Sequence, residues 1–175
     1  SVDSNLEVFD AYLITDNKQW IEIINKSYNK DSINLVHMRK ILSALLENDK
    51  KDIAIEWVKK IRGKTKKINF YSLEMGMYLS LKLDFDNAVD EYLLYLNYSP
   101  NSMKMITQRI MLLTDYNISS NIIRDKLEQT EKKEAKIILS KLEFKLKNYE
   151  ESYSILKTLD NTDNHKIDLV EDLIK

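Results

Sequence analysis

The chain of 175 residues contains no cysteine, only two glycines and a single proline. Without cysteine, neither a disulfide framework nor a thiolate metal site is possible. Strand-rich folds need frequent turns, which favour glycine, proline and asparagine. The scarcity of such residues, with only Gly63, Gly76 and Pro100, therefore predicts long helices joined by short polar loops. Apolar runs are short as well, because the longest clean stretch is about 110–113, well below the length of a membrane span.

Neither sign of charge is in excess. The 27 basic and 28 acidic residues give a formal net charge of −1. Such a balance provides no general attraction to nucleic acid or to an anionic membrane. We therefore expect neither partner on the basis of global charge.

One segment is nevertheless strongly basic. Six cations fall within nine residues: Lys59, Lys60, Arg62, Lys64, Lys66 and Lys67. Such a cluster can bind an acidic peptide or a phosphate backbone, or it can be a helix end whose cations complement the helix dipole. The second interpretation is favoured because no aromatic side chain is interleaved for base stacking. Gly63 is the residue predicted to end this helix.

Apolar residues recur three and four apart along nearly the whole chain, which is the helical period. Capping boxes are indicated at Asp16 with Gln19 and at Asn148 with Glu151, and Ser99–Pro100 has the pattern of an N-cap followed by proline at the first helical position. About eleven helices are predicted, at 3–14, 17–27, 32–47, 50–62, 67–82, 86–97, 100–114, 120–129, 131–146, 149–159 and 163–174.

The chain also repeats itself. A shift of 34 residues places Leu45 on Leu79 and Ala54 on Ala88, and a second shift places Leu79 on Leu113. Within 69–102, Gly76, Ala88 and Pro100 stand at a regular spacing, and the aromatic Tyr92 follows Ala88 on the same helical face. The segment 69–102 thereby resembles the tetratricopeptide repeat, in which small residues let two helices approach closely.

The resemblance implies an all-α fold, a right-handed solenoid of about five antiparallel helix pairs. The repeats are expected at 1–34, 35–68, 69–102, 103–132 and 133–162, within a single domain 1–175 closed by an extra helix at 163–175. The repeats outside 69–102 are degenerate. For example, Leu42 replaces the glycine in the second, whereas Ile123 and Leu127 take the inward positions in the fourth and Ser152 takes the small position in the fifth.

Motifs of catalysis and metal binding were sought, and none was found. The two histidines, His37 and His165, lie far apart in sequence and have no ligand partner three or four residues away. The chain has no glycine-rich phosphate loop and no nucleophile elbow. Carboxylate pairs such as Asp90–Glu91 lie in polar stretches typical of solvated helix faces. We therefore expect no enzyme, no metal and no cofactor.

The resemblance further implies that the first helices of successive pairs line a groove for a peptide or a partner helix. The residues carried over to this groove are Arg39, Ser43, Phe70, Leu73, Met77, Lys104, Thr107 and Met111, with Val36, Leu46, Leu81 and Thr114 at the margins. Family members that grip the acidic tails of heat-shock chaperones use a set of groove cations and asparagines. That pattern is broken here by Glu74, so this particular role is disfavoured.

The leading functional prediction is a non-catalytic scaffold that binds a protein or peptide partner of unknown identity. The alternative is a structural, self-associating module of a larger assembly, such as one for envelope or secretion. Nucleic-acid binding centred on 59–67 is a third and weaker possibility. We expect a soluble chain without a membrane span, and its compartment stays open between cytoplasm and periplasm, because a removed signal or anchor leaves no trace in these residues.

Overall fold

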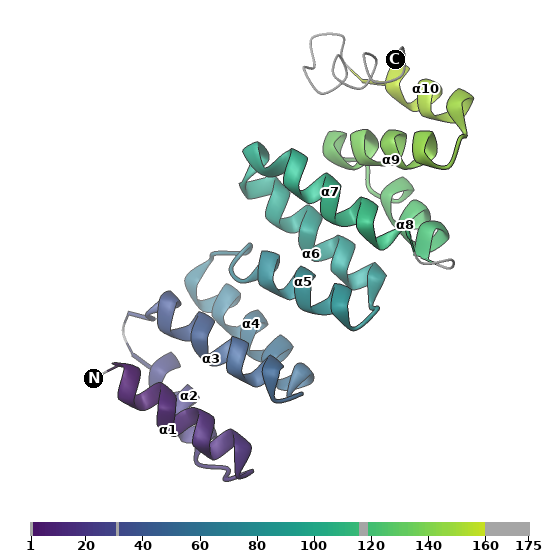
Figure 1. The fold of residues 1–175 in the computed structure, drawn as a ribbon. Helices are drawn as coiled ribbons and strands as arrows, with labels where there is room; N and C mark the ends of the chain where they lie inside the picture. The colour runs from purple at the N-terminus through teal and green to yellow at the C-terminus, as the bar shows by residue number, and fades with distance from the viewer. Residues whose placement is uncertain (1, 31, 116–118, 160–175) are drawn as a thin grey trace. The chain divides into compact units, whose positions relative to one another are not determined.

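The protein is all-helical throughout the residues that the computed structural model describes, namely 2–30, 32–115 and 119–159. These residues form ten α-helices and one short 3₁₀-helix, and no strand is present among them (Figure 1). The all-α prediction is therefore confirmed. The chain divides into two compact units, Ser1–Tyr71 and Ser72–Lys175, which are described separately.

The first unit consists of α1 (Val2–Ile14), α2 (Trp20–Tyr28), α3 (Leu35–Glu47) and α4 (Lys51–Thr65). Helix α3 packs against α1, α2 and α4, because its apolar residues face several directions. The core is built from side chains at helical spacing on each element: Phe9, Trp20, Ile24, Met38, Ile41, Leu42, Leu45, Ala54, Val58 and Ile61. Trp20 and Ile24 are buried, and the ring of Trp20 meets the ring of Phe9 edge-on at 6.5 Å.

The second unit consists of α5 (Ser72–Leu81), α6 (Phe85–Tyr98), the 3₁₀-helix η1 (Pro100–Ser102), α7 (Met103–Leu113), α8 (Ser119–Glu128), α9 (Lys133–Lys145) and α10 (Tyr149–Lys157). Each of α5, α7 and α9 packs on the helix that follows it, and α9 also contacts α6, α7 and α8. Helix α9 is accordingly the most buried helix of this unit, with Ala135, Ile138 and Leu142 fully enclosed. Ile123, Leu127 and Ser152 are buried as predicted.

The same turn recurs between paired helices. Asp16, Asp49, Leu83 and Lys147 each have a positive φ of 50° to 65°. Around each of them, the amide of the following residue donates to the carbonyl five positions earlier, as in Lys50 N to Leu45 O at 2.8 Å and Asp84 N to Leu79 O at 3.0 Å. This left-handed motif satisfies the last free carbonyls of the first helix. The backbone therefore repeats at these turns even though the side chains differ.

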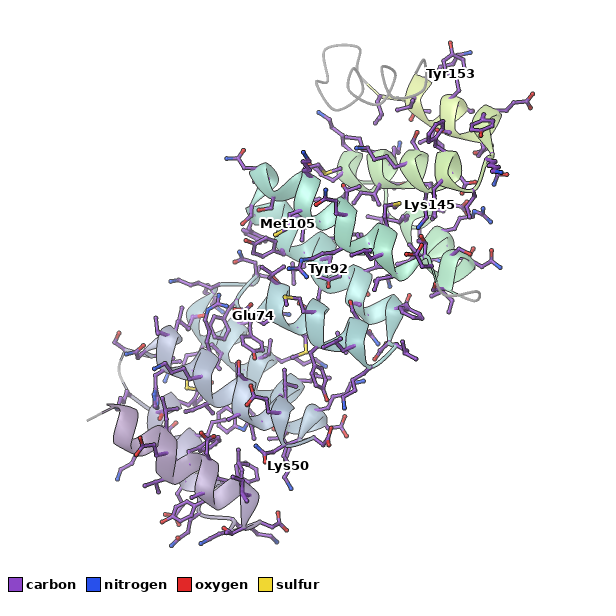
Figure 2. The ribbon with its side chains drawn as sticks, in the orientation of Figure 1. Lys50, Glu74, Tyr92, Met105, Lys145 and Tyr153 are labelled. Atoms are coloured by element: carbon purple, nitrogen blue, oxygen red, sulfur yellow. The ribbon has the colours of Figure 1, made fainter. Side chains whose placement is uncertain are left out.

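Small residues mark where paired helices approach most closely. Tyr92 of α6 lies against Gly76 of α5, and its hydroxyl is 3.1 Å from Ser80 Oγ (Figure 2). In the last described pair, buried Ser140 of α9 and Ser152 of α10 exchange hydrogen bonds with each other's backbone carbonyls, both at 2.9 Å. Small side chains at these sites let the two backbones meet.

Lysines connect one helix pair to the next, and three of their contacts have the same sequence offset. Lys50 Nζ binds Asp16 Oδ1 at 3.1 Å, Lys64 Nζ reaches Lys30 O at 3.3 Å, and Lys145 Nζ reaches Met111 O at 2.9 Å. In each case the partners are 34 residues apart in the chain. The offset equals the repeat length read from the sequence.

Several helix boundaries differ from the sequence prediction: the helices expected from 17, 32 and 100 begin at Trp20, Leu35 and Met103. Two further differences have a visible structural cause. The helix expected over 67–82 begins only at Ser72, because 68–71 form a turn in which Tyr71 takes a positive φ of 64°. The helix expected to end at Gly63 continues to Thr65, and Lys66 takes the left-handed conformation that ends it. Gly63 lies inside the helix with a Cβ position that meets nothing within 4 Å.

The predicted capping boxes at Asp16 and Asn148 are also wrong. Asn17, not Asp16, receives the hydrogen bond from Gln19 N at 3.1 Å. The Asn148 side chain makes no cap and instead donates to Glu143 at 2.6 Å. Pro100 does stand at the first position of a helix, although that helix is 3₁₀. The terminal helix predicted at 163–174 and His165 lie outside the described residues.

Within the described residues, none of the helices combines the length and the apolar character needed to cross a membrane.

Candidate interaction surface

The eight residues predicted to line a groove fall in different units. Arg39, Ser43 and Phe70 belong to the first unit, whereas the other five belong to the second: Leu73, Met77, Lys104, Thr107 and Met111. We therefore considered each unit for itself.

In the first unit, Arg39, Ser43 and Phe70 lie close together. Their contacts are packing contacts within the fold. The Arg39 guanidinium lies 5.1 Å from the centre of the Phe70 ring, and Arg62 Nε donates to the Phe70 carbonyl at 2.9 Å. The Ser43 hydroxyl bonds the hydroxyl of Tyr71 at 2.8 Å. Burial raises the pKa of that phenol, against a smaller opposite effect of the hydrogen bond. This cluster holds the 68–71 turn against α3 and α4.

Burial removes two residues from the predicted set. Phe70 is only 3% exposed and Thr107 only 5%. A side chain that is buried in this way offers no surface to a partner, so neither residue lines an interaction surface. Leu73 and Met111 are half-buried, Met77 is partly exposed and Lys104 is exposed.

The second unit contains a hollow between α7 and α9. Its walls are Gln108, Met111, Leu112 and Asp115 of α7 and its following turn, together with Lys145 of α9, and its volume is about 420 Å³. Leu112 is 65% exposed and lies next to the half-buried Met111 at this hollow. Of the predicted groove residues, only Met111 lines this hollow.

Sequence reasoning missed Leu112 and Lys145 as members of this surface. Leu112 follows Met111 directly and lies on the exposed face of α7 together with Lys104 and Gln108. A helical wheel of α7 alone would have placed Leu112 on the same face as Lys104 and Gln108, because residues four positions apart lie on one face of a helix. Lys145 required knowledge of how α9 packs on α7.

The position of Lys145 is fixed by the end of α7. Its ammonium group donates to the carbonyl of Met111 at 2.9 Å and to the hydroxyl of Thr114 at 2.8 Å, and it forms a short ion pair with Asp115 (Figure 2). A cation at a helix C-terminus satisfies free carbonyls and complements the dipole. Lys145 thus closes one end of the hollow, and its charge is balanced there by Asp115.

Two further lysines stand one helical turn from residues that line the hollow. Lys104 is one helical turn before Gln108 on α7, and Lys141 is one turn before Lys145 on α9. Within the part of the chain that the structure describes, neither lysine is in an ion pair. The surface around Met111 and Leu112 therefore combines exposed apolar atoms with uncompensated positive charge.

A group of acidic residues of the second unit lies on α6. Helix α6 carries Asp86, Asp90 and Glu91 and no base. Lys126 of α8 binds Asp90 at 2.7 Å and Asp86 at 3.3 Å, and the hydrogen bond to Asp90 raises the pKa of Lys126. These carboxylates hold α6 to α8.

An ion pair between a half-buried guanidinium and a buried carboxylate joins α8 to α9. Glu143 is 2% exposed and accepts two bonds from the Arg124 guanidinium, at 2.6 and 3.2 Å. The hydrogen bond to Glu143 raises the pKa of Arg124. With the Asn148 amide also on Glu143, both oxygens of the carboxylate are satisfied. Glu143 therefore serves as a structural link between α8, α9 and the turn that follows α9.

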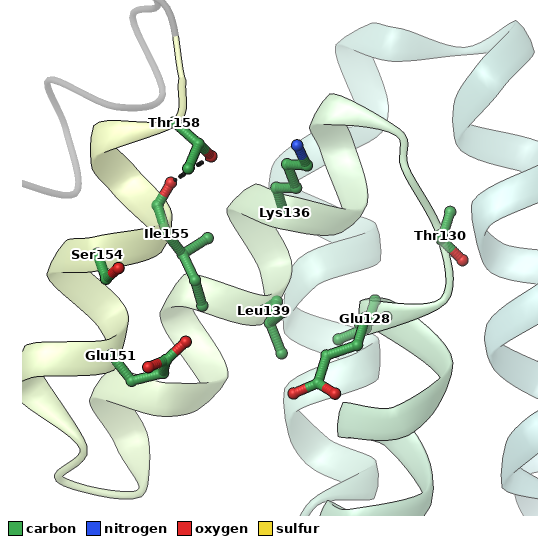
Figure 3. A pocket seen from close by; sticks show the side chains of 9 residues that line it. Glu128, Thr130, Lys136, Leu139, Glu151, Ser154, Ile155 and Thr158 are labelled. Carbon is green, nitrogen blue, oxygen red and sulfur yellow. Dashed lines mark hydrogen bonds between the residues drawn. The ribbon is translucent and has the colours of Figure 1, made fainter.

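A second hollow, of about 260 Å³, lies at the last described helix pair (Figure 3). Leu139 and Ile155 provide its apolar wall, and Glu128, Glu151 and Lys136 surround it. Among the described residues, no group of three histidines or carboxylates that could hold a metal ion is found, here or elsewhere.

The basic segment 59–67 is partly used for packing. Lys60 pairs with Glu56 at 2.5 Å and lies over the ring of Trp57. Lys64 donates to the Tyr28 carbonyl at 2.7 Å and lies over the ring of the same residue. Arg62 and Lys64 also stand in the last turn of α4, where the helix dipole favours cations. These contacts agree with the helix-end interpretation.

Comparisons of this chain with protein-family models, with curated proteins and with solved structures found no match.

Proposed function

We propose that the chain is a non-catalytic interaction module whose helix pairs form a tetratricopeptide-like, right-handed solenoid, and that it binds a protein partner. The recurrence of one turn geometry at Asp16, Asp49, Leu83 and Lys147 supports a repeated architecture. The 34-residue offset of the lysine contacts supports the same repeat length. Stacked repeats of this kind create extended surfaces for binding.

The single observation that carries the binding role is the hollow beside Met111 and Leu112. Leu112 exposes 65% of its surface next to the half-buried Met111. An exposed apolar side chain beside a methionine at a concave site can provide the apolar contact of an interaction surface, and methionine adapts to irregular partners. Met111 was selected from the repeat register alone, and it borders this hollow.

Site-directed photo-crosslinking in the source cell tests the proposal. A benzoylphenylalanine at position 112 of α7 is expected to give a covalent adduct with another protein. The same group at position 97, which is exposed on α6, serves as the matched control. Adducts from position 97 but not from position 112 would contradict the proposed surface.

Self-association is the alternative that must be separated from partner binding. Light scattering of the purified chain over a concentration series is expected to give the monomer mass throughout. A mass that rises with concentration, and that returns to the monomer when Leu112 is replaced by aspartate, would assign the surface to a second copy.

A further inference from the structure

The hollow between α7 and α9 has a charge character that restricts its partner, and the inference drawn from it rests on the proposed function. Its apolar part is Met111 and Leu112, and Gln108 adds an amide with both a donor and an acceptor. The ion pair of Lys145 with Asp115 is neutral as a whole. The other basic residues of the two helices include Lys104 on α7, one turn before Gln108, and Lys141 on α9, one turn before Lys145.

Carboxylates on the same elements do not neutralise these two lysines. On α9, Glu134 and Lys141 are both half-buried, and Glu134 precedes Lys141 by seven residues, about 10 Å along the helix axis. On α7 there is no acidic residue at all. Asp115 is held by Lys145, and Glu143 is buried in its pair with Arg124. The surface beside Met111 and Leu112 is therefore positive.

From this charge complementarity we infer that the hollow binds an acidic, amphipathic segment of a partner protein. A large apolar side chain of the segment lies on Met111 and Leu112, and carboxylates of the segment meet Lys141 and Lys104. Opposite charges at the rim steer the encounter, whereas the apolar contact provides most of the affinity.

The helix geometry gives the spacing within that segment. Lys141 is four residues from Lys145, about 6 Å along α9, and Lys104 is seven residues from Met111, about 10 Å along α7. An extended peptide advances about 3.3 Å per residue. The carboxylates of the partner therefore stand about two to three residues from its apolar anchor.

Selection from a random twelve-residue peptide library displayed on phage, with the full chain immobilised, tests this inference. The expected peptides carry Asp or Glu at that distance from a Leu, Phe or Trp. Binding of a synthetic copy of a selected peptide, measured by fluorescence anisotropy, is expected to weaken about tenfold or more in Leu112→Asp, which removes the apolar contact. Lys104→Glu and Lys141→Glu are each expected to weaken it about threefold or more and to reduce its salt dependence.

Lys59→Glu is the matched control, because Lys59 is an exposed lysine on α4 of the other unit. It is expected to leave peptide binding unchanged. Far-ultraviolet circular dichroism of each variant confirms that a loss of binding is not a loss of folding.

The outcomes separate the inference from the proposed function. Selected peptides that lack carboxylates, or that bind equally well to the Leu112, Lys104 and Lys141 variants, would overturn the inference and leave a peptide-binding module. A selection that enriches no peptide would overturn both. Enrichment of basic peptides, or self-association of the chain that the same variants abolish, would overturn the inference because the occupant would be different.

Discussion

Gly76 and Tyr92 are in such close contact that a Cβ atom on Gly76 would lie 2.7 Å from Cε1 of the Tyr92 ring. The ring cannot easily move, because Tyr92 is 2% exposed and its hydroxyl is bonded to Ser80. The two residues come from α5 and α6, so this contact sets how closely the two helices pack.

Replacing Gly76 with alanine is expected to destabilise the protein by about 1–3 kcal/mol, because overpacking outweighs the gain in helix propensity. Gly63→Ala is the matched control. Gly63 is also helical, but its Cβ position is open, so alanine there is expected to stabilise by about 0.5–1 kcal/mol. Urea unfolding of both variants measures the difference, and equal effects of the same sign would contradict the packing described here.

Leu83 is predicted to be a strained position. It is an exposed leucine with a φ of 60°, a conformation that disfavours residues with a Cβ atom. Leu83→Gly is expected to raise the free energy of unfolding by about 1 kcal/mol. Leu83→Ala removes the same exposed side chain but keeps the Cβ atom, so it is expected to change stability little. A glycine variant no more stable than the alanine variant would argue against the left-handed turn.

The buried pair of Arg124 and Glu143 gives a third prediction. Arg124→Ala leaves the Glu143 carboxylate buried without its cation, and such a loss costs about 3–5 kcal/mol. The double variant Arg124→Met with Glu143→Leu is expected to cost much less, because neither charge remains. Glu56→Ala, which removes an exposed pair with Lys60, is expected to change stability by less than about 1 kcal/mol. If Arg124→Ala and Glu56→Ala proved equally mild in thermal unfolding, Glu143 could not be buried as described.

His37 makes stability depend on pH. Burial lowers its pKa from the ordinary value of 6.5, with a smaller effect of Lys30 and Lys40, and its Nδ1 atom is buried without a hydrogen-bond partner in the described part of the chain. The folded chain then binds a proton on His37 less readily than the unfolded chain does. The contribution of neutral His37 to the free energy of unfolding is therefore complete above pH 6.5, and it is lost as the pH falls toward the lowered pKa. His37→Gln is expected to reduce the loss of stability between about pH 7.5 and 5.5. An unchanged pH profile in urea unfolding would show that His37 does not titrate in this way.

Much of the fold could be predicted from apolar periodicity. That signal is local, and it located all ten described helices together with inward residues such as Ile123 and Leu127. It failed where tertiary contacts decide. The 68–71 turn interrupts a helical pattern because Tyr71 reaches Ser43, which lies 28 residues earlier in the chain.

The candidate surface was predicted less well, for a related reason. The position of a residue in a repeat does not show whether its side chain faces solvent, because a small rotation about the helix axis turns it into the core. Phe70 and Thr107 were therefore predicted to lie on the surface, although both are buried. Lys145 could not be assigned to the surface without knowing that it reaches across to the end of α7. Met111 was predicted as a groove residue from its position in the repeat, and it borders the hollow.

Methyl NMR of the full chain labelled at its methionines tests the central claim, that the α7/α9 hollow is the binding surface, most directly. The chain has six methionines. Met111 lines the hollow, whereas Met38 is fully buried in the other unit. Titration with the selected acidic peptide is expected to shift the Met111 methyl resonance and to leave that of Met38 in place. A Met111 signal that does not move while the peptide binds would contradict the account.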